Sequence, residues 1–488
     1  MRLVNRYGVA LLLAATVTGG CATTGTPVSK GDEDEAAAAK NETAPKPPSS
    51  EKIAEAKQAK PKNEGPKISA SAKAEFDAAV KKWETAKASK TGINPADCKG
   101  LASSFSRISE PALAAQAHFN AGTILEGCGY DKDAESEYHA ALSANPAYGP
   151  AMANLGEMYY KQNNPTTAKS WFEKAIEADA AHSGAAFANL GAIEYTQGRQ
   201  TGDRSLYNQA ISNLRRALAI DAYDVRAYSI LALVYYTIAE NDKSKLDLAT
   251  LTCHQGQEIE GGKDYPPIWN TLGLIELRRK NPSRALTFFN KAVELDPKYI
   301  DAHLNIGAIG LSTRQYEKAA ASFAAVLKLD PKSFDATIGM GVASRGLKKI
   351  DEAESWYKKA ADLAPNSCAV QYNLGVLYQD YKSDPNNTNL NQAKDYFGKF
   401  RSCSNADQKK VADAERRMKD IDDTFAALEQ QKKMEAELKE QQAEMEKQQK
   451  AMEEQQKQQQ QQQAPNGAAP SGTTAAPAPS GGAAKPNK

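Results

Sequence analysis

One helix-turn-helix unit recurs eight times along the middle of this 488-residue chain, and an internal repeat of this length limits the possible folds more than any local propensity does. A small residue marks the same point in every copy, and these reference residues are Gly122, Gly156, Gly191, Ala232, Gly273, Gly307, Gly341 and Gly375. Their successive spacings are 34, 35, 41, 41, 34, 34 and 34 residues. The period therefore predicts an all-α chain of stacked helical hairpins.

The same residue types recur at fixed distances from the reference residue. In the fifth copy Gly273 is followed by Ala285, Phe289, Ala292 and Pro297. We expect the small residues to lie where the two helices of a hairpin approach closely, and the aromatic residue to fill the gap between one hairpin and the next. Proline should end the second helix. The extra residues of the third, fourth and eighth copies are polar, so they should lengthen loops or helix ends.

These offsets resemble the tetratricopeptide repeat. The resemblance implies an α-solenoid over residues 111–407, a right-handed superhelix of about eight helical hairpins that binds other proteins. The end of such a stack needs a cap, because its last packing face would otherwise be exposed to water. Phe76, Ala79, Val80 and Trp83 follow helical spacing, so residues 69–110 are predicted to form N-terminal capping helices.

The N-terminus has the features of a secreted protein. Arg2 and Arg6 precede an apolar run over 7–17, which is too short to span a bilayer and is typical of a signal peptide over 1–20. The small residues before Cys21 resemble a bacterial lipobox, although Thr18 stands where Leu is usual; the resemblance implies that Cys21 carries fatty acids. The residue after Cys21 is Ala22 and not the Asp that resembles an inner-membrane retention signal. This favours a location on the periplasmic side of the outer membrane. The alternative is an ordinary signal peptide cut elsewhere.

The flanking segments differ in composition from the repeats. Residues 21–68 combine prolines with charged residues and are predicted to be a disordered linker behind the lipid anchor. Residues 408–463 predict a long, charged, Gln-rich helix, and 464–488 a disordered tail. The apolar residues of the second half of that helix are sparse, so any self-association through a coiled coil should be weak; they are Met434, Leu438, Met445 and Met452.

Five cysteines remain besides Cys21, in what should be an oxidising compartment. Cys98 is expected to begin one helix and Cys128 to end the next, which places them side by side in an antiparallel pair. Cys368 and Cys403 have the same relation in the eighth copy. Both pairs are predicted to be disulfides, which leaves Cys253 free; the alternative is that all five are buried as small apolar residues.

Charge and motifs argue against several classes of function. A formal net charge of +1 without a basic stripe argues against nucleic-acid binding. The five histidines are scattered, without the spacing of a metal site, and no nucleophile motif is present. We therefore expect no catalytic residue, no metal and no cofactor.

A column of asparagines is the first candidate for binding. In proteins with this repeat the first helix lines the concave wall, and the position two residues before the reference residue faces into it. Five copies have asparagine there, namely Asn120, Asn154, Asn189, Asn305 and Asn373. A carboxamide both donates and accepts, so such a column can bind the backbone of an extended peptide. It resembles the asparagine ladder of O-linked N-acetylglucosamine transferases. The alternative is that these side chains only fix helix packing.

Tyrosines form the second candidate. Tyr160, Tyr195 and Tyr236 each lie four residues after the reference residue, and tyrosine combines apolar area with a hydroxyl group at a recognition surface. Packing is again the alternative. Arg226 and Arg278 are candidates to meet acidic groups of a ligand.

The order of lipobox, linker, repeats and Gln-rich helix resembles the tetratricopeptide lipoproteins of bacterial gliding-motility complexes. This resemblance implies a scaffold that binds extended peptides of other envelope proteins and helps to assemble a multiprotein machine. The alternative is a pilotin-like chaperone that assembles the secretin of a type IV pilus or secretion system. A regulator of cell-wall enzymes is a third possibility.

Overall fold

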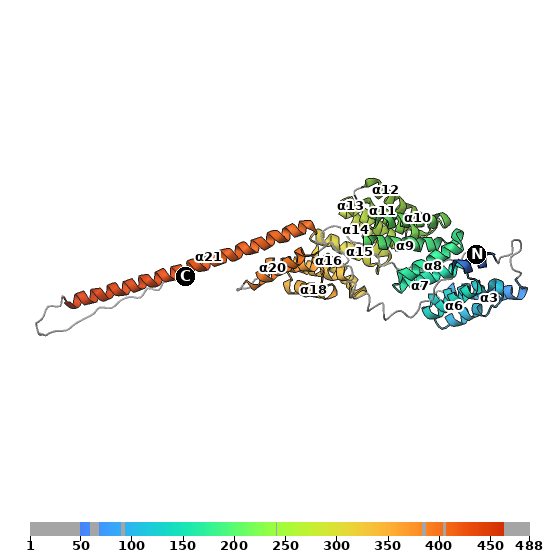
Figure 1. Cartoon of the computed structure of the whole chain (residues 1–488), viewed down its shortest axis with the longest axis horizontal. Helices are drawn as coiled ribbons and strands as arrows, with labels where there is room; N and C mark the ends of the chain where they lie inside the picture. Colours follow the sequence, from blue (N-terminus) through green and yellow to red (C-terminus); the bar gives the residue numbers. More distant parts are fainter. Residues whose placement is uncertain are drawn as a thin grey trace, which may run out of the picture. The chain divides into compact units, whose positions relative to one another are not determined.

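The computed structural model describes residues 49–58, 68–88, 93–240, 242–382, 387–403 and 407–462 (Figure 1). Their regular structure is α-helical apart from one short 3-10 turn, Ala180–His182. The chain divides into two compact units, Met1–Val411 and Ala412–Lys488. The predicted signal peptide with Cys21, most of the predicted linker and the predicted tail lie outside the described residues.

Eight helical hairpins follow one another in the first unit, as the repeat predicts. Their helix pairs are α5 (Pro111–Gly127) with α6 (Asp131–Ala144), α7 (Gly149–Lys161) with α8 (Pro165–Ala178), α9 (Gly184–Thr201) with α10 (Arg204–Ile220), α11 (Val225–Ala239) with α12 (Lys243–Gln257), α13 (Pro266–Arg278) with α14 (Pro282–Leu295), α15 (Ile300–Ser312) with α16 (Tyr316–Leu329), α17 (Phe334–Gly346) with α18 (Ile350–Leu363), and α19 (Cys368–Asp380) with α20 (Thr388–Arg401). Each second helix packs on the first helix of the next repeat. The array is therefore an α-solenoid.

The turn inside a hairpin depends on one residue in the left-handed conformation, seven positions after the reference residue. Gly129 has φ 79°, and the corresponding Asn163, Lys280, Arg314 and Lys348 have φ between 59° and 62°. This conformation ends the first helix and reverses the chain. In the third copy the helix continues through that position instead, so the extra residues there lengthen α9 to Thr201.

The turn between repeats depends on an Asp or Asn side chain after the second helix. The side-chain oxygens of Asn145, Asp221, Asp296 and Asp330 each accept a hydrogen bond from the backbone N–H two residues later. This local bond competes with the helix and favours a turn. In three of the four sites a proline follows directly, which prevents the helix from continuing.

The reference glycines are required by close packing inside each hairpin. A Cβ atom on Gly156 would lie 2.6 Å from the ring of Phe172, and one on Gly375 would lie 2.7 Å from the ring of Phe397. The aromatic residue of the second helix thus packs on the first helix of its own hairpin, whereas we had expected it between hairpins. Phe323 does both, since it also approaches Gly339 of the next repeat.

Replacing Gly156 by Ala should destabilise the array by about 1–3 kcal/mol, because Phe172 would have to leave its position. Urea denaturation followed by circular dichroism measures the effect. Gly100→Ala in helix α4 (Cys98–Ser106) is the control, since a Cβ atom there meets nothing within 4 Å and alanine favours a helix. Equal denaturation midpoints for the two variants would contradict this account.

Two helices lie in the segment predicted to cap the array, α3 (Ala70–Lys87) and α4. Phe105 of α4 is fully buried, and its ring meets Phe76 and Trp83 of α3 edge-on at 5.6 and 6.2 Å between centroids. Helix α4 packs in turn on α5, the first helix of the array. These aromatic residues join the two helices, and α4 covers the first hairpin.

The linker prediction over 21–68 is wrong for one part of that segment. Residues Ser50–Gln58 form helix α2, which contacts α8 of the second repeat. Ile53 is 1% exposed, and Lys174 of α8 donates a hydrogen bond to the Ser50 hydroxyl at 2.7 Å. A single apolar residue therefore anchors this helix in a segment whose composition is otherwise that of a linker.

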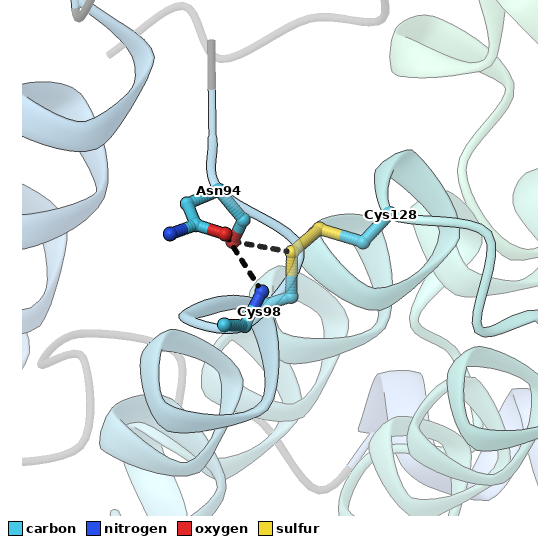
Figure 2. Close-up of a disulfide and its surroundings, with 4 residues drawn as sticks. Asn94, Cys98 and Cys128 are labelled. Carbon is cyan, nitrogen blue, oxygen red and sulfur yellow. Dashed lines mark hydrogen bonds between the residues drawn. A yellow bond between two sulfur atoms is a disulfide. The ribbon is translucent and has the colours of Figure 1, made fainter. Parts of the chain in front are cut away.

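One of the two predicted disulfides is present. Cys98, the first residue of α4, is bonded to Cys128, which follows the last residue of α5 (Figure 2). The two Cα atoms are 6.4 Å apart and the residues are 30 positions apart in the chain. The bond therefore ties the cap to the first repeat.

The second predicted disulfide is not formed, and the prediction for Cys368 and Cys403 is wrong for this structure. Both are free cysteines, as is the buried Cys253. The Cys403 thiol points to the last turn of α20, where it donates to the carbonyl of Lys399. Burial and the neighbouring Cys368 raise the pKa of Cys403 to about 12, so the nucleophilic thiolate is disfavoured.

Helix α21 (Gln408–Gln462) accounts for the described part of the second unit, as the sequence predicts. The four sparse apolar residues of its second half, Met434, Leu438, Met445 and Met452, are 55–63% exposed. Weak self-association through them stays a prediction. In the part of the chain that is described, no helix combines the length and apolar character needed to cross a bilayer.

Candidate partner-binding site

A pocket of about 290 Å³ opens among the first helices of the third to sixth repeats. Helices α9, α11 and α13 and the beginning of α15 supply its walls. Ile230, Leu233 and Leu274 form an apolar part of the lining. Apart from Pro267, the remaining lining is tyrosine, polar or charged; the residues discussed below are Tyr195, Arg199, Tyr236, Asn270, Arg278, Tyr299 and Asp301. The site therefore combines apolar, aromatic and ionic surface.

Arg278 lies over an aromatic ring at one side of the pocket. Its guanidinium carbon is 3.8 Å from the centroid of the Tyr236 ring, and Nη1 donates to the backbone carbonyl of Tyr236. The contact joins α13 to α11 and restricts the arginine to one orientation. A guanidinium has five N–H donors, so further donors remain after this bond.

Tyr195 and Arg199 form the α9 wall. Tyr195 is 1% exposed, and its hydroxyl oxygen lies 3.0 Å from Oγ1 of Thr237 in α11. The guanidinium carbon of Arg199 is 6.0 Å from the Tyr195 ring centroid. Arg199 belongs to the part of α9 that is longer than in the other repeats, so the insertion of the third copy delivers this cation to the pocket.

Asp301, in the first turn of α15, is an acid in a low-polarity environment. It is 7% exposed, and burial raises the pKa of its carboxyl group to about 7. The positive charge of Arg199 and a hydrogen bond from Tyr299 oppose the shift, and the negative charge of Asp335 adds to it. Near neutral pH this carboxyl group is therefore partly protonated.

The asparagine column lies inside the protein and not on an open wall. Asn120, Asn154, Asn189, Asn305 and Asn373 are between 0% and 8% exposed. Asn373 donates to the backbone carbonyl of Ala369 in its own helix. Oδ1 of Asn305 is buried without a hydrogen-bond partner among the described residues.

Three of these asparagines link one repeat to the repeat before it. Asn154 donates to the Tyr138 hydroxyl, Asn189 to the buried Glu157 carboxylate and Asn305 to the Asn270 carboxamide, each at 2.9 Å. The predicted candidate Arg226 extends the chain of contacts, since it donates to Oδ1 of Asn189 at 2.8 Å. This geometry favours the packing alternative for these three residues, because each buried carboxamide donates to a side chain of the preceding repeat.

Replacing Asn189 by Ala should destabilise the array by about 1–3 kcal/mol, because the buried Glu157 carboxylate loses its hydrogen-bond donor. Urea denaturation measures the loss. The control is Asn208→Ala, since Asn208 is an exposed residue of α10 in the same repeat. A variant with unchanged stability but weaker partner binding would restore the peptide ladder.

The pocket contains only part of the predicted binding set. Tyr195, Tyr236 and Arg278 meet there, whereas Tyr160 is half-buried, bonds to Thr196 and packs on the core of the first repeats. Sequence reasoning missed Arg199, Tyr299 and Asp301. The signal for Arg199 was the insertion itself, and the signal for Asp301 was an acid at the start of an otherwise apolar first helix.

The described ranges contain no group of three or more His, Cys, Asp or Glu side chains that could hold a metal ion. Burial raises the pKa of the Cys253 thiol far above its usual range, so this cysteine is a poor nucleophile.

An α-solenoid with a mixed pocket on its first helices defines a class of protein that typically binds other proteins and is not catalytic. Family models described as tetratricopeptide repeat match residues 149–182, 266–299 and 311–367. The array is thus a tetratricopeptide-repeat α-solenoid. Among curated proteins no significant sequence match is found.

Solved structures of tetratricopeptide-repeat proteins resemble this chain. PilF of Pseudomonas aeruginosa is 20% identical, with 46% of this chain and 95% of that chain covered and a TM-score of 0.38. PilW, a type IV pilus biogenesis factor, is 19% identical, with 46% and 97% covered and a TM-score of 0.36. A repeat protein from Parabacteroides merdae is 15% identical, with 56% and 98% covered and a TM-score of 0.37.

Proposed function

We propose that this chain is a lipid-anchored scaffold on the periplasmic side of the outer membrane, which binds other envelope proteins through the first helices of its repeats. The observation that carries the binding role is the pocket among α9, α11, α13 and α15. It offers tyrosine, arginine and apolar surface together, which is the mixture that dominates protein recognition. The anchor and location rest on the sequence around Cys21.

The anchor is tested by Cys21→Ser. Cells that express the unchanged protein should incorporate labelled fatty acid into it and retain it in the outer-membrane fraction. The variant should lose both, since acyl chains supply the membrane affinity. Labelling of the variant, or an unlabelled natural protein, would refute the anchor and leave the binding role standing.

Binding is tested by photo-crosslinking in the native envelope. A photoreactive residue at Thr237, which lines the pocket, should capture one or a few envelope proteins. The same residue at Asn208, exposed on the second helix α10, is the matched control and should capture little. Equal yields at the two positions would contradict binding through the pocket.

We further propose that the scaffold serves a machine for cell movement, because the order of lipobox, linker, repeats and Gln-rich helix resembles that of the lipoproteins of gliding-motility complexes. Deletion of the gene should abolish gliding and leave secretin multimers intact. Loss of the multimers would instead favour the pilotin-like role. Capture of peptidoglycan hydrolases in the crosslinking experiment would favour a role in regulating cell-wall enzymes.

A further inference from the structure

The second half of helix α21 has an apolar stripe that nothing in the single chain covers. Every residue from 429 to 462 is exposed, along a helix that runs without a break (Figure 1). Leu438, Met445 and Met452 follow one another at intervals of seven residues, and Met434 lies four residues before the first. Seven residues are close to two turns, so these side chains lie on one side of the helix. In a heptad lettered a to g, Met434 takes position d and the other three take position a.

The lysines of this segment all avoid the stripe. Those between 431 and 458 fall on positions b, c and f, on the opposite side of the helix, and they are Lys432, Lys433, Lys439, Lys447, Lys450 and Lys457. Two of them form ion pairs along that side, Lys433 with Glu429 at 3.0 Å and Lys450 with Glu446 at 3.5 Å. A helix that stays alone in water can carry such pairs on every side. The exclusion of lysine from one side therefore indicates that this side meets a partner.

We propose that residues 431–458 pair with the same segment of a second copy of this chain, as a parallel two-stranded coiled coil in register. In this arrangement position a meets position a, so Leu438, Met445 and Met452 each pack on their own equivalent. An antiparallel pair sets position a against position d instead. Because position d holds glutamine after Met434, at least two of the three apolar residues would then face glutamine.

The polar residues beside and within the stripe fit the same pairing. At position d the helix has Gln441, Gln448 and Gln455, and a carboxamide both donates and accepts, so equivalent glutamines can bond to each other. In a parallel pair each acid at position e or g lies opposite a glutamine, and no like charges meet; the pairs are Glu437 with Gln442, Glu444 with Gln449 and Glu435 with Gln430. Polar residues in a coiled-coil core fix the register at a cost in stability, so the dimer should dissociate on dilution.

Pairing would bring two repeat arrays together. A partner with two binding segments would then be held more tightly than by one array, without any new contact in the arrays. The inference does not use the pocket among α9, α11, α13 and α15, so failure of the dimer leaves the binding role standing.

Cysteine crosslinking tests the direction of the pair. Full chains in detergent carry C368S/C403S, which removes two free cysteines, and either L438C or M452C. A disulfide needs two Cα atoms within about 7 Å. Each variant should therefore form a crosslinked dimer with itself on mild oxidation, above the background of the C368S/C403S parent. The two positions are about 21 Å apart along the helix, so a mixture of the two variants should give no mixed dimer.

The stripe itself is tested with L438E/M445E, which places charge at position a in two successive heptads. Light scattering of the natural chain should show a mass that rises with concentration from one copy toward two, and the variant should remain at one copy. The matched control A436E/A443E adds the same charge at position f of the same heptads and should dimerise as the natural chain does. Glutamate favours a helix, so circular dichroism should show equal helix content in both variants.

Several outcomes would overturn the proposal. One is a natural chain that keeps the mass of one copy at concentrations on the order of 0.1 mM. Mixed dimers of L438C and M452C would show an antiparallel pair, and equal dimerisation of L438E/M445E and A436E/A443E would show that the stripe is not the contact. Crosslinking of L438C in the native envelope to a different protein, without self-crosslinks, would assign the stripe to that protein instead.

Discussion

Ionisation of Asp301 should lower the free energy of unfolding of the repeat array as the pH rises from about 4 to about 7. The variant Asp301→Asn should not show this decrease. The folded-state pKa of Asp301 is raised from 3.8 to about 7, so the folded chain holds a proton that the unfolded chain releases. The contribution is therefore complete below pH 3.8 and lost as the pH passes 7. Above that pH the natural chain should lose on the order of 4 kcal/mol relative to the variant.

Urea denaturation of both chains between pH 4 and pH 8.5 measures the difference. The acid is faced by Arg199 of α9, by Tyr299 and by Asp335 of α17, and these groups remain in both chains. Asp362→Asn, at an exposed position of α18, is the control and should follow the natural chain at every pH. Parallel curves for the natural chain and Asp301→Asn would show that the acid ionises normally.

Removal of the Cys98–Cys128 bond should cost about 3–4 kcal/mol, because the unfolded chain then gains the freedom of a loop that the bond closes over 30 positions. The loss should be largest near α4 and α5, since each repeat is stabilised mainly by its neighbours. Hydrogen exchange, measured on C98S/C128S and on the natural chain, shows in which helices the stability is lost.

The matched control for this experiment is C368S/C403S. Those residues are free cysteines in the structure, so their replacement should change stability by less than about 1 kcal/mol. A large loss in this control, reproduced by reducing agent on C98S/C128S, would show that Cys368 and Cys403 are bonded after all.

The fold was predictable because its determinants are local. Small residues such as Gly156 and aromatic residues such as Phe172 recur at fixed offsets, and the contact between them lies within one hairpin. Helix α2 was not predictable in the same way, because Ile53 is a single apolar residue and its partner surface on α8 lies more than a hundred residues away in the chain.

The candidate site was only partly predictable, because periodicity shows which face a side chain points to but not what it meets there. The Asn189 side chain points toward the preceding repeat, where its amide group donates a hydrogen bond to Glu157. Tyr236 and Arg278 could be identified as candidates, whereas their partnership with Arg199 and Asp301 depends on four successive repeats being stacked. No local pattern contains that information.

The cross-link between cap and first repeat also determines how the protein would respond to mechanical load. Tension applied between the two ends of the chain would pass through the sulfur–sulfur bridge, so the residues from 99 to 127 would carry none of it. Among the described residues the other cysteines are free, so the later repeats have no such bypass and could extend one hairpin after another. A pulled molecule could therefore lengthen through its later repeats, whereas residues 99–127 could not be drawn out.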